Sequence, residues 1–232
     1  ADSLTAIRKC VFEDKTIDPN VLIEALKANF TGYENIHGIL ASAPKYGNDD
    51  DYADNMAYDV YHWWSGMVND TFEAGFGTHY LPGSYSVSNH TPMGRNTGAL
   101  PDGRYAGEAL ADGSVSPRQG VDFCGPTAVL NSAIKIDQDE MITTLLNIKF
   151  QENTLKDAAD REKLAMLIKT YFNGGGKHIQ FNVVSKSTLL DAQTAPERHR
   201  DLIVRVAGYS AFFVELVPTL QKEIIARTEN DI

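Results

Sequence analysis

A stretch rich in glycine and proline in the middle of the chain constrains the fold more than any other feature. Ten of the 18 glycines and five of the nine prolines lie within residues 75–127. These residues break helices and strands, so the stretch is expected to be loop. Apolar and turn-forming residues are interleaved throughout, which argues against a disordered linker. We therefore predict an ordered, strand-anchored loop system, and ordered loops of this length are commonly functional.

A short alternating run lies inside this stretch, at residues 84–88 (Ser-Tyr-Ser-Val-Ser). Alternation with a period of two is typical of a strand, and it would place Tyr85 and Val87 on the same face. The run therefore predicts the strand that anchors the loops.

Regular patterns flank the loop region on both sides. Apolar residues at helical spacing predict helices near residues 2–11, 19–30 and 50–72. The third of these would use a stripe of Met56, Val60, Trp63 and Met67 to pack against something larger. Beyond residue 126, strands are expected at 143–150, 178–184 and 202–206, helices at 156–172, around 189–192 and at 218–228, and either type at 128–136. This alternation predicts an α/β arrangement with largely parallel strands.

Charge and cysteine content narrow the class of protein. The 21 basic and 31 acidic residues give a net charge of −10, which disfavours a nucleic-acid binder because no broad basic face would neutralise phosphates. No apolar run approaches the ~20 residues of a membrane-spanning helix, and the first residues do not resemble a signal peptide. Two cysteines in 232 residues make no disulfide framework. A soluble, cytoplasmic protein of one or two domains is predicted.

The common motifs for phosphate, metal and thiol chemistry do not occur. No P-loop or dinucleotide fingerprint is present, and Gly174–Gly176 ends a predicted helix instead. The six histidines are scattered, so no bound metal is predicted. His90 is the best placed of them for a pocket, although a hydrogen-bonded loop histidine is the simpler interpretation. Neither Cys10 nor Cys124 has a neighbouring base to activate its thiol, so both are expected to be structural.

A lone glycine interrupts the last predicted strand. Residues 204–206 run directly into Ala207-Gly208-Tyr209-Ser210, and the apolar residues 212–214 follow. From these residues alone, the simplest interpretation is a buried tight turn in which glycine tolerates the backbone angles.

The segment around this glycine also resembles the C-terminal signature of glycyl radical enzymes, the family of pyruvate formate-lyase and the glycerol and diol dehydratases. Arg205–Ser210, followed by Ile224–Glu229, carries the resemblance. Further segments in the family's order are residues 43–50, 101–104, 110–113, 125–128 and 178–184. The chain is thereby identified as similar, over essentially its whole length, to the C-terminal portion of such an enzyme.

The resemblance implies a fold, a radical site and a cofactor. Residues 1–110 are expected to form the C-terminal part of the barrel domain, a partial half-barrel with helices and a pocket strand at 81–90. Residues 111–232 are expected to form the glycine radical domain, with the radical loop and the C-terminal helix. Gly208 is the predicted radical site, because glycine becomes planar at its α-carbon with little steric cost. In this anaerobic family an activating enzyme with an iron–sulfur cluster and S-adenosylmethionine installs the radical.

In the family the stored radical converts a nearby cysteine to a thiyl, which takes hydrogen from the substrate. Neither Cys10 nor Cys124 matches the Gly-Cys-Val-Glu type motif of that cysteine. The resemblance therefore implies a split, heteromeric enzyme in which a second chain supplies the cysteine and the remaining barrel. The alternatives are a spare-part protein that restores an oxygen-damaged pyruvate formate-lyase-like enzyme, and a radical-free structural protein. The length of chain upstream of the radical loop favours the split enzyme over the spare-part protein.

The substrate class is also implied by resemblance. Residues 81–88 resemble the pocket-lining segment of the dehydratase-type members, so Tyr85 and Val87 are predicted to contact substrate. The implied reaction removes hydrogen beside a hydroxyl and then eliminates water or another leaving group from a small polar molecule. In this family the choice of substrate depends largely on residues upstream of this chain, so the substrate itself stays open.

Overall fold

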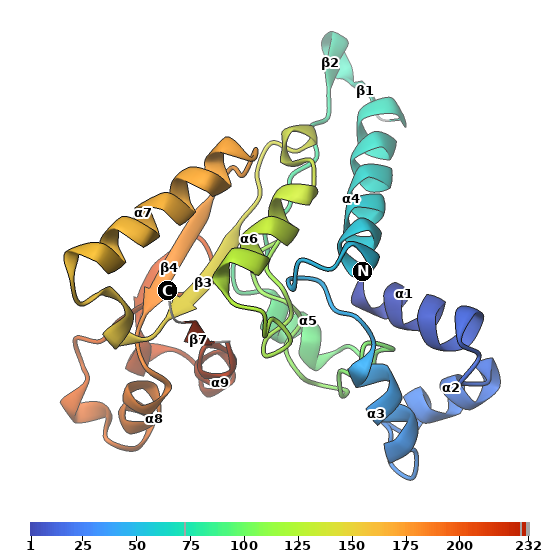
Figure 1. The fold of residues 1–232 in the computed structure, drawn as a ribbon, viewed down its shortest axis with the longest axis horizontal. Helices are drawn as coiled ribbons and strands as arrows, with labels where there is room; N and C mark the ends of the chain where they lie inside the picture. The colour runs from blue at the N-terminus through green and yellow to red at the C-terminus, as the bar shows by residue number, and fades with distance from the viewer. Residues whose placement is uncertain (72, 228, 231–232) are drawn as a thin grey trace.

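The chain folds into a helical half and a half of mixed helices and strands, with the loop region between them (Figure 1). This computed structural model describes residues 1–71, 73–227 and 229–230. Positions 72 and 228, at the ends of two predicted helices, and positions 231–232 of the predicted radical domain lie outside the described residues.

The described helices and strands follow the chain in this order. The α-helices are α1 (Asp2–Ile7), α2 (Pro19–Lys27), α3 (Glu34–Ser42), α4 (Asp51–Thr71), α5 (His90–Arg95), α6 (Pro126–Lys135), α7 (Ala158–Asn173), α8 (Lys186–Thr194) and α9 (Pro218–Ala226). The strands are β1 (Glu73–Ala74), β2 (Thr78–His79), β3 (Leu146–Phe150), β4 (Ile179–Val183), β5 (Ile203–Arg205), β6 (Ser210–Phe212) and β7 (Glu229–Asn230). A π-helical turn, Arg8–Glu13, continues α1 directly.

The first three helices bury a small core of their own. The α2 helix begins where predicted, because the Asp18 carboxylate accepts from the Asn20 and Val21 amides and Pro19 occupies the first turn. The α3 helix was not predicted; it is short, and Gly38 interrupts its helix-forming pattern. The buried side chains of this core are Ala6, Cys10, Val11, Ile17, Leu22, Ala25, Phe30, Ile36, Leu40 and Ala43.

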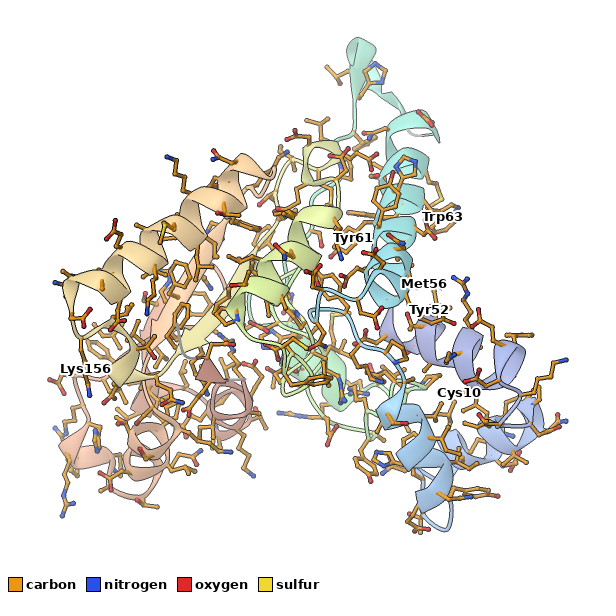
Figure 2. The ribbon with its side chains drawn as sticks, viewed as in Figure 1. Cys10, Tyr52, Met56, Tyr61, Trp63 and Lys156 are labelled. Carbon is orange, nitrogen blue, oxygen red and sulfur yellow. The ribbon has the colours of Figure 1, made fainter. Side chains whose placement is uncertain are left out.

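The α4 helix forms as predicted but packs through a different face. Ala57, Tyr61 and Trp64 contact the main core, whereas Trp63, from the predicted stripe, is 67% exposed. Figure 2 shows Tyr61 pointing toward the centre of the molecule and Trp63 pointing away from it. The predicted stripe is therefore only partly covered by the described residues, since Met56 is half-buried and Val60 and Met67 are 36% and 37% exposed. Among those residues, no helix is both long and apolar enough to span a bilayer.

A parallel sheet of order β4–β3–β7 forms the second half, beside α7 (Figure 1). The pairing of β3 with β4 runs in register from Leu146 opposite Ile179 to Phe150 opposite Val183. The α7 helix connects β3 to β4, as a parallel pair requires. The predicted α/β arrangement is confirmed, and α6 shows that residues 128–135 of the segment left open at 128–136 are helical. The segment at 202–206 differs from the parallel pattern, because β5 pairs with β6 as an antiparallel hairpin.

The strand predicted at 84–88, within the pocket strand expected at 81–90, is wrong. No described residue from 80 to 88 is in a strand, and Val87 has a φ of +51°, in the left-handed region that ends an extended run. The segment is instead anchored to residues 142–143, since Ile142 N–H donates to the Pro82 carbonyl and Ser84 N–H donates to that of Thr143. Tyr85 and Val87 therefore do not share the face of a strand.

The loop region is ordered around one buried arginine. Arg104 is 1% exposed, and its guanidinium donates to the carbonyls of Gly94 (2.6 Å), Gly98 (2.8 Å), Ala109 (3.4 Å) and Glu108. The Gly94 carbonyl also accepts from Thr97 N–H, but a single guanidinium that binds all these carbonyls supplies much of the pairing that buried backbone groups require. Arg104 thus ties the loop closed and confirms the prediction that it is ordered.

Replacing Arg104 with methionine should destabilise the chain strongly. The change keeps much of the side-chain volume but removes the donors of several carbonyls, so the free energy of unfolding should fall by at least about 3 kcal/mol in urea titrations. Arg161→Met, an exposed change on α7, should cost less than about 0.5 kcal/mol. A loss for Arg104→Met no larger than this control would contradict the proposed role of the arginine.

Candidate functional site

Gly208 lies at the tip of the β5–β6 hairpin. Arg205 pairs with Ser210, and Val206 N–H donates to the Tyr209 carbonyl at 2.9 Å. Gly208 is the third residue of the turn that starts at Val206, and its φ is +83°. A positive φ at this position favours glycine, so the tight turn expected from the sequence is confirmed.

The turn is not buried, however. Val206 and Ala207 are 0% and 1% exposed, but Gly208 itself is exposed. A Cβ added to Gly208 would meet Leu145 Cδ1 at 3.5 Å, which is ordinary contact. The positive φ therefore favours glycine at this position, although there is room for a Cβ.

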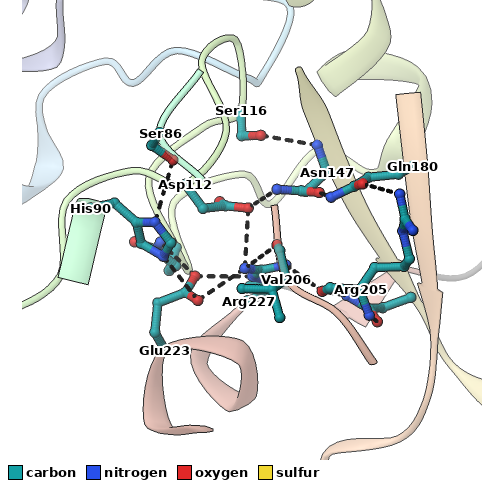
Figure 3. A network of polar contacts seen from close by, with 12 residues as sticks. Ser86, His90, Asp112, Ser116, Asn147, Gln180, Arg205, Val206, Glu223 and Arg227 are labelled. Atoms are coloured by element: carbon teal, nitrogen blue, oxygen red, sulfur yellow. Dashed lines mark hydrogen bonds and ion pairs between the residues drawn. The ribbon is translucent and has the colours of Figure 1, made fainter. Parts of the chain in front are cut away.

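A line of polar side chains leads to the amide of Gly208, and Figure 3 shows its members Asp112, Asn147, Gln180 and Arg205. Gly208 N–H donates to Gln180 Oε1 at 3.3 Å, and Arg205 Nη2 donates to the same oxygen at 2.8 Å. Gln180 Nε2 donates to Asn147 Oδ1, and Asn147 Nδ2 donates to the Asp112 carboxylate. The β5–β6 hairpin is thereby connected to β4, β3 and the central loop.

The carbonyls just before Gly208 are held by a second group, from α9 and the residue after it. Arg227 Nη2 donates to the Val206 carbonyl at 2.9 Å, and Arg227 Nη1 donates to that of Arg205 at 3.3 Å. The same guanidinium forms a two-point pair with Glu223, with both distances at 2.9 Å. Its Nη2 also lies 3.5 Å from Asp112 Oδ2, which joins the two lines of contacts.

Charge pairing sets the protonation of this buried cluster. Burial alone would raise the pKa of Glu223, but the Arg227 charge and the His90 hydrogen bond outweigh it and lower the pKa to about 2. Burial would lower the pKa of Arg227, yet Asp112 and Glu223 raise it above the usual value. Burial raises the pKa of Asp112, partly offset by Arg227. Glu223 and Arg227 therefore form a stable ion pair beneath the hairpin.

The cluster extends to the segment that was predicted to line a substrate pocket. His90 Nε2 lies 3.2 Å from Glu223 Oε2, and His90 Nδ1 lies 3.3 Å from Ser86 Oγ. His90 is 2% exposed, as expected for a hydrogen-bonded histidine inside the protein. A continuous path of polar contacts thus runs from Ser86, beside Tyr85, to the carbonyl of Val206 (Figure 3).

Tyr85 itself borders a concavity of about 460 Å³. Its lining residues are Val60, Tyr61, Trp64, Gly83, Ser84, Tyr85, Ser86 and Gly113. Tyr85 is 57% exposed, and Val87 and Gly208 do not belong to the lining. Tyr85 and Gly208 are connected through the Ser86–His90–Glu223–Arg227 path rather than through a shared cavity.

Several residues of this site were not predicted individually from the sequence. The segments that supported the family resemblance contain or adjoin these residues, but none of their side chains was singled out. The residues are Gln180, Asn182, Asp112, Glu223 and Arg227. The spacing of Glu223 and Arg227, four positions apart at the end of the last helix, was a usable signal for an ion pair.

Neither cysteine takes part in the cluster. Cys10 is buried in the core of the first helices, where burial raises the pKa of its thiol, and Cys124 is exposed just before α6. Within the described residues, no three His, Cys, Asp or Glu side chains are grouped so as to hold a metal ion.

Comparison with known proteins identifies the family. A family model described as Glycine radical matches residues 111–214, and one described as Pyruvate formate lyase-like matches residues 1–94. The structure of a glycyl radical enzyme from Archaeoglobus fulgidus matches 100% of this chain with a TM-score of 0.91 at 39% identity, and the chain covers 29% of it. The chain belongs to the glycyl radical enzyme family.

Dehydratases and lyases are among the relatives of this glycyl radical enzyme chain. Isethionate sulfite-lyase from Nitratidesulfovibrio vulgaris is 45% identical over 100% of the chain, and the chain spans 28% of that relative. Glycerol-bound B12-independent glycerol dehydratase from Clostridium butyricum is 44% identical with a TM-score of 0.95, over 100% of this chain and 29% of that one. The predicted fold, the C-terminal part of the family's barrel with its radical domain, is confirmed.

The Glu223–Arg227 pair should make stability depend on pH in the acid range. Because the folded-state pKa of Glu223 is below its usual 4.5, the stabilisation is complete above pH 4.5 and is lost as the pH falls toward 2. Between these limits the free energy of unfolding should fall by roughly 2–3 kcal/mol more in the wild type than in Glu223→Gln. Urea titrations at a series of pH values measure the difference, and parallel curves for the two proteins would contradict it.

Proposed function

We propose that Gly208 carries the radical of this glycyl radical enzyme chain. The observation that supports this most directly is the placement of Gly208 within the residues matched by the Glycine radical model, at a turn whose two sides are both held by side chains. A radical at an α-carbon is stabilised when the flanking amide nitrogen and carbonyl are coplanar with it. Gly208 has no Cβ to oppose that flattening.

The residues around Gly208 have distinct tasks in this proposal. Gln180 fixes the amide on the N-terminal side of Gly208, and Arg227 fixes the carbonyls of Arg205 and Val206. The exposed α-carbon is open to an approaching activating enzyme of the radical S-adenosylmethionine type, which removes one hydrogen atom and leaves the radical. No bound metal takes part within this chain, and the proposed location is the cytoplasm.

We further propose that the thiyl cysteine and the rest of the barrel come from polypeptide outside residues 1–232. In a split enzyme, a second chain supplies them. The chain spans 28–29% of its relatives, and neither of its cysteines lies in the polar cluster. Exposed apolar side chains on α4 and the following segment offer a surface for that remaining part. They are Val60, Trp63, Met67, Tyr80, Leu81, Tyr85 and Val87.

A spare-part role for an oxygen-damaged pyruvate formate-lyase-like enzyme is the second candidate. The match of residues 1–94 to the Pyruvate formate lyase-like model favours the split enzyme over the spare-part role, because a spare part needs little beyond the radical loop.

The reaction class we propose is elimination from a small polar substrate, by cleavage of a C–O or other carbon–heteroatom bond. The support comes from relatives whose names state such chemistry, an isethionate sulfite-lyase and a trans-4-hydroxy-L-proline dehydratase from Clostridioides difficile, the latter 43% identical over 98% of this chain. Tyr85 and Val87 are the proposed substrate contacts. Tyr85 meets this role by its exposed position at the concavity, and Val87 by its neighbouring place in the loop.

Gly208→Ala should abolish the radical while leaving the chain folded. Alanine at a φ of +83° costs about 1–2 kcal/mol, which a folded domain tolerates. After anaerobic treatment with the activating enzyme, electron paramagnetic resonance should show a glycyl doublet in the wild type and none in Gly208→Ala. On exposure to oxygen, mass spectrometry should show chain cleavage at residue 208 in the wild type alone.

Gly175→Ala provides the matched control for this experiment. Gly175 also has a left-handed φ, +96°, with open space around its Cβ position, and it lies at the end of α7, away from the hairpin. This variant should keep the doublet. A doublet or a cleavage product in Gly208→Ala would overturn the assignment of the radical site.

Turnover should require the cysteine-bearing part of the enzyme. The activated chain alone should show the doublet but no product from isethionate, glycerol or trans-4-hydroxy-L-proline, and full turnover by residues 1–232 alone would exclude the split arrangement.

In the assembled enzyme, Tyr85→Phe should lower kcat/KM roughly three- to tenfold, the effect of one lost hydrogen bond, without changing the doublet. Tyr105→Phe, in the stacked pair with His37, is the control and should leave kcat/KM unchanged.

A further inference from the structure

Gln180 touches the backbone of Gly208 directly. Its carboxamide is 6% exposed on β4, and its oxygen accepts two hydrogen bonds, from Arg205 Nη2 at 2.8 Å and from Gly208 N–H at 3.3 Å. The contact with Gly208 comes from the neighbouring sheet, so it does not arise from the hairpin's own pairing.

The orientation of this carboxamide is fixed by its partners. A guanidinium can only donate, so the Gln180 oxygen, not its nitrogen, must face Arg205. The nitrogen then faces Asn147 Oδ1, and the Asn147 nitrogen faces the Asp112 carboxylate, an acceptor. Reversing either amide would place two donors or two acceptors opposite each other. The chain of contacts from Asp112 through Asn147 to Gln180 (Figure 3) therefore keeps an acceptor pointed at the Gly208 amide.

We propose that Gln180 is a positioning residue for the Gly208 radical, an inference that rests on the function proposed above. The unpaired electron spreads onto the flanking amide nitrogen only while that amide plane is aligned with the half-filled orbital on the α-carbon. A hydrogen bond from Gly208 N–H to a fixed oxygen sets the direction of the N–H bond, and hence of that plane. The bond also polarises the N–H group, which increases electron donation by the nitrogen.

The hairpin keeps other attachments when this contact is removed. Asn182 binds both backbone groups of Arg205, accepting from its N–H and donating to its carbonyl, each at 2.7 Å. Arg227 holds the Arg205 and Val206 carbonyls independently of Gln180. Loss of the Gln180 oxygen should therefore release the Gly208 amide without releasing the hairpin, which separates a positioning role from a general structural one.

Amide hydrogen exchange in the unactivated chain tests the contact itself. In Gln180→Leu the Gly208 amide should exchange about two- to tenfold faster, as expected for one lost hydrogen bond, while the Val206 amide, which donates to Tyr209, keeps its rate. Gln180→Glu retains an acceptor toward Gly208 but loses the donor to Asn147, so its Gly208 rate should lie between those of the wild type and Gln180→Leu. Gln193→Leu, which removes a carboxamide that contacts Gln221 elsewhere in the same half, should change neither amide.

Electron paramagnetic resonance of the activated protein then tests the effect on the radical. Gln180→Leu should alter the α-proton splitting of the doublet and shorten its anaerobic lifetime severalfold, whereas Gln193→Leu should resemble the wild type. Gln180→Glu, which keeps the acceptor toward Gly208, should deviate less from the wild type than Gln180→Leu. Unchanged exchange at Gly208 in Gln180→Leu, equal acceleration at Val206, or an unaltered doublet and lifetime would each overturn the positioning role. Absence of a doublet from every protein, the wild type included, would instead refute the proposed function and leave the exchange result standing.

Discussion

The Arg227 guanidinium lies buried between Glu223, Asp112 and the carbonyl of Val206. Removing one charge of such a group leaves the others unpaired in a medium that solvates them poorly, so the cluster is stable only when complete. Because its members come from α9, the central loop and the hairpin, completing it requires all three to be in place. The position of Gly208 is in this sense a product of the whole second half of the chain.

The two buried arginines play related parts in different places. Arg104 satisfies carbonyls at the end of α5 and in the loop that follows it, and Arg227 satisfies the carbonyls of Arg205 and Val206 at the start of the β5–β6 turn. In both cases a planar group with several fixed donors replaces the regular hydrogen bonding of secondary structure. The glycine-rich middle of the chain can therefore be irregular and still be ordered.

Periodicity in the sequence was enough to predict most helices and the strands β3 and β4, because those elements are stabilised by apolar faces that repeat at 3.6 or two residues. The two-residue strand β7, which completes the parallel sheet, is too short to show a period. Periodicity failed at residues 84–88, where the alternation reflects serines that lie in a loop and Val87 has a left-handed backbone. It also placed Trp63, which is 67% exposed, on the packed face of α4, since apolar residues occupy both sides of that helix and a pattern cannot state which side has a partner. Gly208 stood out through its family resemblance, whereas Gln180 and Asp112 did not, because their contacts join positions 28 and 115 residues away in sequence, Gly208 and Arg227.

Because the ion pairs beneath the β5–β6 hairpin are buried, the geometry of the hairpin should depend little on the salt concentration of the solution. Mobile ions screen exposed pairs such as Glu24 with Lys27 within about 10 Å at 0.1 M salt, but they do not enter the space between Arg227, Glu223 and Asp112, whose side chains are 1–6% exposed. The turn at Gly208 should therefore keep its geometry in dilute buffer and in concentrated electrolyte alike. The geometry of the site is set by the protein interior and is largely insulated from ionic strength.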